Sequence, residues 1–425
     1  MASQTSLHIP PEIVASILQL VSDDTNTLKN CSIVDRDFCG EAQRILFRKV
    51  TLTFPYDGTN ERFHELERVT KYVKHLVVIA MCNHNAMSVD SPLLSERDNP
   101  ATGHSTPAPI PQFVALDKLT IRGCCDTNTH NWETGPSDQC RDFVSSLLSQ
   151  AHNIRKLSLH DIFLFDAFRH MRPGQSLDLL TLVGRSTVSS DRIVGNVQVS
   201  PVTIKGLHLE PSPNGTAPNS INLICDSLVR VRQARQPLLF FASCSLLEVL
   251  DQIDSQRVRD LWQCAGNMKD LVIHVQVFAR KYCDLMSSIS TLITYASESS
   301  VRRTQWPLSL DGLPGLRTLE FHSVDPNKRS LPKRATEMLD TLETRGLTQL
   351  TFTYDPPSDY MAFDMTPWGA LDAAIVVLFN RSCVNRNTII HIRIGKNVVD
   401  FPGSQTANFL RLSKSRGMQV QFFYV

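Results

Sequence analysis

The chain has 425 residues, a net charge of +1 at neutral pH and 42% hydrophobic residues, an ordinary composition for globular proteins. This length allows two or three domains and a sizeable core. The balanced charge gives no global field that would favour nucleic acid or a membrane surface, so we expect neither as a partner. The sequence has no apolar run of bilayer length and no secretory signal at its N-terminus. Eleven scattered cysteines indicate reduced thiols and a cytoplasmic or nuclear protein.

The first fifty residues predict three short helices. The stretch LHIPPEIVASILQLVSDD (7–24) opens with two prolines, which suit a helix start because the missing N–H groups have no partner there. At 100° per residue its apolar side chains cover an arc of about 160°, wider than the stripe of roughly 100° that covers a core. Two more helices are predicted in TLKNCSIV (27–34) and DRDFCGEAQRILFRKV (35–50). Three such helices make only a marginal core. We therefore expect the remaining apolar surface of the first helix to be buried by the downstream domain or by another protein.

A pattern of short motifs runs through this module. It is carried by Ile9, Pro10, Glu12, Ile13, Ile17, Leu18, Leu28, Cys31, Val34, Arg36, Leu46, Phe47 and Arg48. In order and spacing the pattern resembles the F-box of many fungal proteins, with Phe38 where that family usually has tryptophan and Asp35 where it has cysteine. The resemblance implies that residues 1–50 dock on a Skp-family adaptor and, through it, on a cullin.

The wide face of the first helix is expected to serve two contacts. One edge would pack on the other two helices through Ile13, Ile17 and Phe38, and the adaptor would bury the remainder. The residues predicted for the adaptor-binding surface are Pro10, Ile13, Val14, Ile17, Leu18, Val21, Leu28, Val34, Phe38 and Leu46. The alternative is that the module is only an N-terminal cap of the larger domain.

Beyond residue 50 one short pattern recurs: an apolar residue, two others, an apolar residue, one other and an apolar residue. It appears at 73–78, 116–121, 154–159, 177–182, 204–209, 268–273, 316–321, 347–352 and 389–394, with a looser instance at 246–250. Alternation of this kind predicts short, half-buried strands. Amphipathic helical stretches precede several of them, at 140–153, 335–346 and 368–380. A helix and a strand repeated every 23 to 48 residues, roughly, are typical of a solenoid.

The pattern resembles a degenerate leucine-rich repeat, although no asparagine ladder follows the strands. The comparable positions hold Ile162, Ser212 and Gln276. The motif Trp368, Leu371 and Asp372, after an F-box and irregular units, is similar to a large class of F-box proteins of mushroom-forming fungi. We therefore predict an α/β protein: a small N-terminal three-helix F-box (1–50), then an irregular leucine-rich-repeat-like strand-helix solenoid (51–425) with a disordered insertion at 87–112. A plain α/β domain with one mixed sheet is the alternative.

Motifs of catalysis are missing from the sequence. It has no phosphate-binding glycine loop, no nucleophile elbow, and no H-E-x-x-H or C-x-x-C pair. The nearest metal candidates, CNH (82–84) and CCDTNTH (124–130) with Cys140 nearby, do not supply four ligands at a recognised spacing. His160, His208, His274 and His322 recur near strand positions and are interpreted as polar surface residues. We expect no enzyme, no cofactor and no metal.

The predicted function is that of a substrate-recognition adaptor in an SCF-type cullin-RING ubiquitin ligase. The ligase would supply the chemistry, and this chain would raise the local concentration of one target protein. A non-ligase F-box-like interaction scaffold is the alternative, and a hydrolase or transferase with hidden catalytic residues comes third.

The substrate is expected to contact the residues that lie between the paired apolar residues of each strand, because these point away from the core. They are Val77, Thr120, Ser158, Thr181, His208, Val272, Glu320, Thr351 and Arg393. Among them His208, Glu320 and Arg393 are the predicted substrate-binding residues, with Tyr354 and Tyr360 as anchors on the rim. Trp368 is a further rim candidate, but core packing is the favoured interpretation for it.

Overall fold

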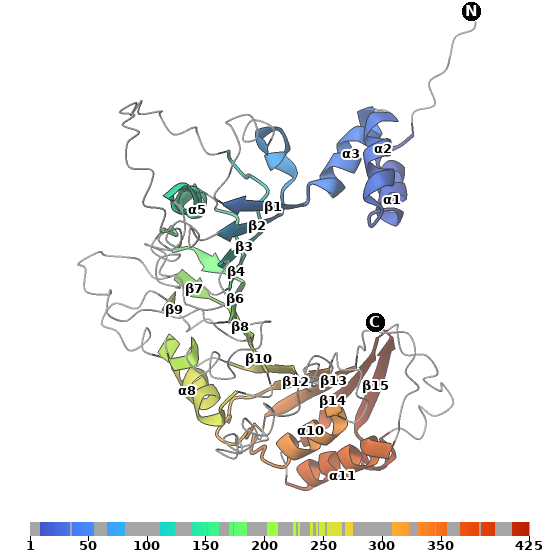
Figure 1. Cartoon of the computed structure of the whole chain (residues 1–425). Coiled ribbons are helices and arrows are strands. Elements are labelled where there is room, and N and C mark those ends of the chain that lie inside the picture. Colours follow the sequence, from blue (N-terminus) through green and yellow to red (C-terminus); the bar gives the residue numbers. More distant parts are fainter. Residues whose placement is uncertain are drawn as a thin grey trace, which may run out of the picture. The chain divides into compact units, whose positions relative to one another are not determined.

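The structure, a computed structural model, describes residues 9–34, 36–54, 66–80, 111–123, 138–150, 152–160, 170–172, 174–184, 202–210, 224–226, 228–229, 239–240, 244, 246–250, 253–265, 268–274, 308–323, 330–344, 346–354, 366–381, 384–395 and 410–424. It is a mixed α/β protein with a large parallel sheet (Figure 1). The chain divides into two compact units, Met1–Val202 and Thr203–Val425. Among the described helices, none combines the length and apolar character needed to cross a membrane.

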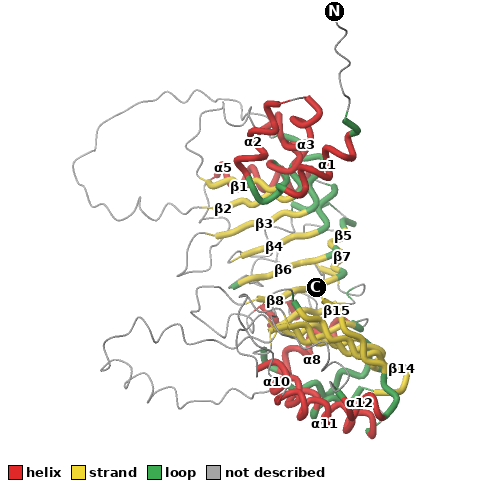
Figure 2. The backbone as a smooth tube through the Cα atoms, turned by 90° about the vertical axis from the view of Figure 1, so that its right-hand side faces the viewer, coloured by secondary structure: helices red, strands yellow, loops and turns green. Residues whose placement is uncertain are grey.

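The first unit begins with the predicted helical module. Its elements are α1 (Pro11–Leu20), α2 (Thr25–Val34), α3 (Arg36–Leu46), β1 (Lys49–Phe54), η1 (Thr70–Tyr72), β2 (His75–Ala80), β3 (Lys118–Gly123), α5 (Asp138–Gln150), β4 (Lys156–His160), β5 (Ser176–Leu177) and β6 (Leu179–Val183). Strands β1, β2, β3, β4 and β6 are neighbours in that order and pair in parallel, as the successive rungs in Figure 2 show. A separate boundary near residue 50 stays a prediction.

The second unit continues the alternation of strands and helices. Its elements are β7 (Val202–Ile204, at the boundary), β8 (Gly206–Glu210), β9 (Leu239–Phe240), β10 (Leu246–Leu250), α8 (Ser255–Ala265), β11 (Asp270–His274), β12 (Thr318–Ser323), α10 (Ser330–Leu339), β13 (Leu347–Tyr354), α11 (Thr366–Asn380), β14 (Val384–Ile394), α12 (Arg411–Ser415) and β15 (Gln419–Tyr424). Strands β8, β10, β11, β12, β13, β14 and β15 pair in parallel in chain order. The predicted strand positions are confirmed, and the alternative of a mixed sheet is wrong for these strands.

One face of the strands is a continuous apolar layer. Each strand has two paired apolar residues, and the first of them lies beside the first of the next strand. All of these residues are at most 1% exposed. In the first unit this row is Leu76, Leu119, Leu157 and Leu180, and in the second it is Leu207, Leu247, Leu271, Leu319, Leu350 and Ile390. In the second unit α10 and α11 lie on one side of the strands (Figure 1). We call the strand face opposite the apolar row the open face.

Backbone hydrogen bonds repeat at the start of successive strands. The carbonyl of Lys74 accepts hydrogen bonds from the N–H groups of Asp117 and Lys118, at 3.0 and 2.9 Å. The carbonyl of Arg317 accepts in the same way from Thr348 and Gln349, at 2.8 and 3.2 Å. Equivalent pairs end on the carbonyls of Arg48, Asp117, Arg155 and Lys269. Successive strands therefore begin with the same backbone geometry, although the loops that connect them differ in length.

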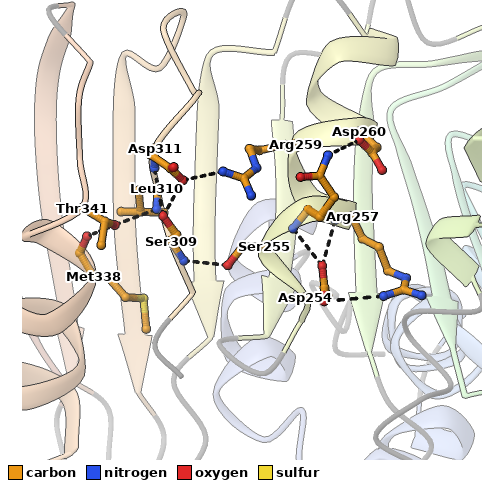
Figure 3. Close-up of polar contacts among 11 residues, drawn as sticks. Asp254, Ser255, Arg257, Arg259, Asp260, Ser309, Leu310, Asp311, Met338 and Thr341 are labelled. Carbon is orange, nitrogen blue, oxygen red and sulfur yellow. Dashed lines mark hydrogen bonds and ion pairs between the residues drawn. The ribbon is translucent and has the colours of Figure 1, made fainter. Parts of the chain in front are cut away.

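In the second unit, side chains rather than an asparagine ladder connect successive strand-helix repeats (Figure 3). The N–H of Ser309 donates to the hydroxyl of Ser255 at 2.8 Å, and the N–H of Leu310 donates to that of Thr341 at 2.7 Å. Arg259 and Asp311 form an ion pair at 2.7 Å beside them. A buried backbone N–H without an acceptor costs about 1–3 kcal/mol, and these hydroxyls supply the acceptors here in place of asparagine side chains.

Candidate interaction site

The helical module has its own small core, and that core contains residues that we expected at the adaptor surface. Val14, Leu18, Leu28 and Ala42 are at most 1% exposed and pack together. The side chains partly buried against them are Val21, Cys31, Phe38, Ile45 and Leu46. The prediction that Phe38 packs inside the module is therefore confirmed. Val14, Leu18 and Leu28 lie within the core and are not accessible to a partner, which corrects the expectation for those three.

The other stripe of α1 is exposed. Ile13 and Ile17, expected to pack inside, are 50% and 44% exposed, and Leu20 is 87% exposed. At 100° per residue these three side chains fall within about 60° of one another, next to the buried stripe that contains Leu18. The wide apolar face is thus divided between an inner and an outer stripe, but the assignment of Ile13 and Ile17 to the inner one is wrong. Pro10 and Val34, two further predicted residues, are also exposed.

On the open face of the second unit, the predicted substrate-binding residues separate into two places. Glu320 on β12 and Arg393 on β14 lie together, with an Arg393 side-chain nitrogen 3.4 Å from a Glu320 carboxylate oxygen. The hydroxyl of Thr353, on the strand between them, donates to the same carboxylate at 2.8 Å. His208 lies on β8, three strands away in the strand order.

The two predicted tyrosine anchors are not seen on the rim. Tyr354 is 2% exposed, because it ends β13 on the apolar side of the strand, so its assignment as an exposed anchor is wrong. Tyr360 lies outside the described residues. Trp368 is 3% exposed and packs edge-on against Phe352, with ring centroids 6.0 Å apart, which confirms its core interpretation.

The predicted register is shifted by two residues on β14. Thr351 faces His391, whereas Arg393 faces Thr353. Several small side chains at the predicted outward positions are also covered: Thr120, Ser158 and Thr351 are at most 6% exposed. Longer side chains on the same face cover these positions. His75, which pairs with Lys118 two residues before Thr120, is an example: its Nε2 is 3.0 Å from the Thr120 hydroxyl.

Five titratable side chains meet on β8, β10, β11 and β12. Nδ1 of His208 lies 3.1 Å from Oε2 of Glu248, and Nε2 of His274 lies 3.7 Å from the same oxygen. The rings of His208 and His274 are stacked at 5.2 Å, and the ring of His322 follows at 5.2 Å from His274. Glu210 is 3.1 Å from the second nitrogen of His208.

Protonation in this cluster follows from burial and from charge. Burial lowers the pKa of His208, although Glu248 and Glu210 act in the opposite direction. Burial would raise the pKa of Glu248, but the neighbouring His274 and His208 outweigh it and the net pKa is lowered. At neutral pH Glu248 is therefore a carboxylate and His208 a neutral imidazole, a combination suited to accepting hydrogen bonds or a cation.

The open face of the first unit is basic. Lys49, His75, Lys118 and Lys156 lie side by side on β1 to β4. They help to line a hollow of about 850 Å³ next to α3, together with Arg44, Arg48 and Lys74. The pKa of His75 is lowered from 6.5 to about 4, by burial first and then by the charge of Lys118 and other cations. Burial is the main cause of that shift, and the neighbouring cations add to it in the same direction.

Sequence reasoning missed Glu248 and the proximity of His274 to His208. Glu248 is the middle residue of LLEVL, which was recognised only as a loose strand. Aligning the paired apolar residues of 204–209 and 246–250 would have placed Glu248 beside His208, because strands in a parallel stack follow chain order. The signal was therefore present, but it needed the strand order as well as the pattern.

The candidate cysteine metal sites receive no support. Cys140 is buried on α5, and burial raises the pKa of its thiol to about 12, so it stays protonated. Residues 82–84 and 124–130 lie outside the described residues, as does most of the insertion at 87–112.

No protein-family model matches the chain. No curated protein matches it either. The class that the fold defines is a mixed α/β protein built on parallel strands, and the function has to be argued from its surfaces.

Proposed function

We propose that this protein is a substrate-recognition adaptor of an SCF-type cullin-RING ubiquitin ligase, working in the cytoplasm, the nucleus or both. Its F-box-like helical module would bind a Skp-family adaptor and, through it, a cullin. Its leucine-rich-repeat-like strands and helices would hold a target protein. The chain itself would catalyse nothing, and the gain would come from the higher local concentration of the target near the ligase.

The observation that carries the proposal is the exposed apolar stripe of α1. Ile13, Ile17 and Leu20 are large, exposed and adjacent, while the same helix buries Val14 and Leu18 in the module core. Exposed apolar patches of this kind mark protein interfaces, and a helix presented in this way suits a groove on a partner. The resemblance of the module to the F-box supports the identity of that partner.

The repeated units support the second half of the proposal. The aligned leucine row and the recurring carbonyl acceptors are the features of a stacked array, as in a leucine-rich repeat. Arrays of this type bind partners on an extended sheet face. In this chain the open face of the second unit carries charged side chains such as Glu320 and Arg393, which suit recognition of a polar protein surface.

The direct test is a titration of a purified Skp-family adaptor against the full-length protein. Ile17→Asp introduces a charge into the exposed stripe without entering the module core. We expect it to weaken binding at least 100-fold, because a buried unpaired charge at an interface costs several kcal/mol. Gln19→Asp is the matched control, since it places the same carboxylate on an exposed position of the same helix outside that stripe.

Folding is controlled in the same samples by the thermal unfolding midpoint, which both substitutions should leave nearly unchanged because both sites are exposed. Equal adaptor affinity for Ile17→Asp and the wild type would refute the interface. If the wild type does not bind the adaptor at all, the ligase role is wrong and the interaction-scaffold alternative replaces it.

A further inference from the structure

The cluster on the open face of the second unit has the composition of a metal site. His208, Glu248 and His274 each offer one ligand atom, and the three atoms lie within 4.8 Å of one another. They come from three adjacent parallel strands, β8, β10 and β11, whose backbone is held by the sheet hydrogen bonds. A site built on strands rather than on loops keeps the backbone of its ligands in place without the metal.

The distances approach those that a tetrahedral ion requires. Four ligands at about 2.0–2.1 Å from Zn²⁺ are separated from one another by about 3.3 Å. The observed separations from Oε2 of Glu248 are 3.1 Å to Nδ1 of His208 and 3.7 Å to Nε2 of His274. Two of the three edges are therefore nearly correct before any ion is bound.

Nε2 of His274 lacks a hydrogen-bond partner within the described part of the chain, although the atom is buried. A buried ring nitrogen without a partner is costly, and a metal ion is one of the groups that can satisfy it. The atom lies on the same side of the sheet as Glu248 and faces its carboxylate.

The second nitrogen of His208 is also arranged as in a metal site. While Nδ1 faces Glu248, Nε2 lies 3.1 Å from Oε1 of Glu210. A carboxylate behind a metal-binding imidazole fixes the ring orientation and raises its basicity, and this pairing is usual at zinc sites. Glu210 therefore acts on the ion through His208, as a positioning residue.

We propose that His208, Glu248 and His274 form a binding site for a borderline divalent cation, Zn²⁺ being the best fit, on the open face of the second unit. Two imidazoles and one carboxylate match the zinc sites that keep a fourth position for water or a partner's ligand. The ligand set is poor for Ca²⁺ and Mg²⁺, which prefer oxygen. The proposal does not depend on the ligase role.

One ring must turn when the ion binds. The planes of His208 and His274 are only 9° from parallel, whereas a shared ion lies in the plane of each ring that binds it. His274 is the ring expected to turn, because its Nε2 is 3.7 Å from Oε2 of Glu248, longer than a hydrogen bond, and would approach the same carboxylate through the ion. His208 is held from both sides by Glu210 and Glu248 and stays in place.

The test uses the full chain, stripped of metal with a chelator and titrated with Zn²⁺ by calorimetry. The wild type should bind one more Zn²⁺ per chain than the double variant His208→Ala/His274→Ala, a difference that cancels binding by the cysteines. Glu248→Gln should weaken this binding by roughly 100-fold or more, and Glu210→Gln by roughly 10–100-fold. His391→Ala, a histidine elsewhere on the same open face, is the matched control and should bind as the wild type does.

Thermal unfolding gives a second readout that does not need a functional partner. Zn²⁺ should raise the midpoint of the wild type and of His391→Ala, and should leave that of the double variant unchanged. Metal-free midpoints show whether the variants fold. The proposal is overturned if the wild type and the double variant bind the same number of Zn²⁺ ions with the same affinity, or if Mg²⁺ produces the same increase as Zn²⁺.

Discussion

The open faces of the two units have the same backbone geometry but carry different charged side chains. In the first unit, neighbouring strands present Lys49, Lys118 and Lys156, whereas in the second they present Glu248 and Glu320 among histidines. Beneath both faces runs the same kind of buried leucine row. The comparison shows that the apolar pattern determines the fold, while the alternate residues are free to determine what each face binds.

The charged neighbours of the histidines differ between the two faces, although burial is the main cause that lowers the pKa values of His75, His160 and His208 alike. His75 and His160 lie among cations, and burial together with those charges lowers both pKa values to about 4. In the second unit the imidazoles lie beside carboxylates, and the pKa of Glu248 is lowered. His160 and His274 occupy equivalent strand positions, three residues after Leu157 and Leu271, and the first lies among cations while the second lies beside Glu248.

The largest expected effect is a loss of stability when a side chain of the buried face is removed. Phe352 is fully buried and stacks on Phe321 with centroids 5.6 Å apart, so Phe352→Ala should lower the free energy of unfolding by about 3–5 kcal/mol. Thr353→Ala, one residue along the same strand but on the open face, should cost about 1 kcal/mol through its lost hydrogen bond. Urea unfolding measures both free energies. Similar losses of stability in the two variants would contradict the claim that the buried face supplies most of the stability.

A smaller effect sharpens the electrostatic contrast. Between pH 6.5 and pH 4 the unfolded chain protonates His75 and His160 while the folded protein keeps them neutral, so stability falls as the pH is lowered through this window. The combined loss should be on the order of 2 kcal/mol after solvent screening. His75→Gln/His160→Gln should reduce the loss, and Lys118→Gln should raise both histidine pKa values in an NMR titration. Unchanged histidine titrations in Lys118→Gln would show that this lysine does not contribute to the potential.

Much of the fold follows from the sequence because one strand pattern is repeated. Alternation of leucines predicts strands such as β2, β3 and β12, and their order in the parallel stack follows the chain. The register fails on β14 because IIHIRI satisfies the pattern in two ways, and only pairing with β13 selects His391 over Arg393. Local pattern cannot make that choice, since a shift of two residues keeps the same face.

The site was less predictable for a related reason. The 160° apolar face of α1 predicts two contacts, but not which stripe faces the core, because both stripes carry large aliphatic residues. Only the packing of α3 against α1 determines that Leu18 is inside and Ile17 outside. His208, Glu248 and His274 are separated by tens of residues, and only the sheet brings them together.

The central claim is that the α1 stripe and the open face of the second unit have separate partners. The most direct measurement is a quantitative comparison of co-purifying proteins for the wild type, Ile17→Asp, and Glu320→Gln/Arg393→Gln, all at equal expression. The account predicts that Ile17→Asp loses the Skp-family adaptor and the cullin but keeps the remaining partners. The open-face variant should keep the adaptor and the cullin and lose one of the others. Stability should change little, because the partly buried ion pair is replaced by two amides that can still hydrogen-bond, and such pairs contribute about 1 kcal/mol. Loss of the same proteins in both variants, or of none in either, would contradict the account.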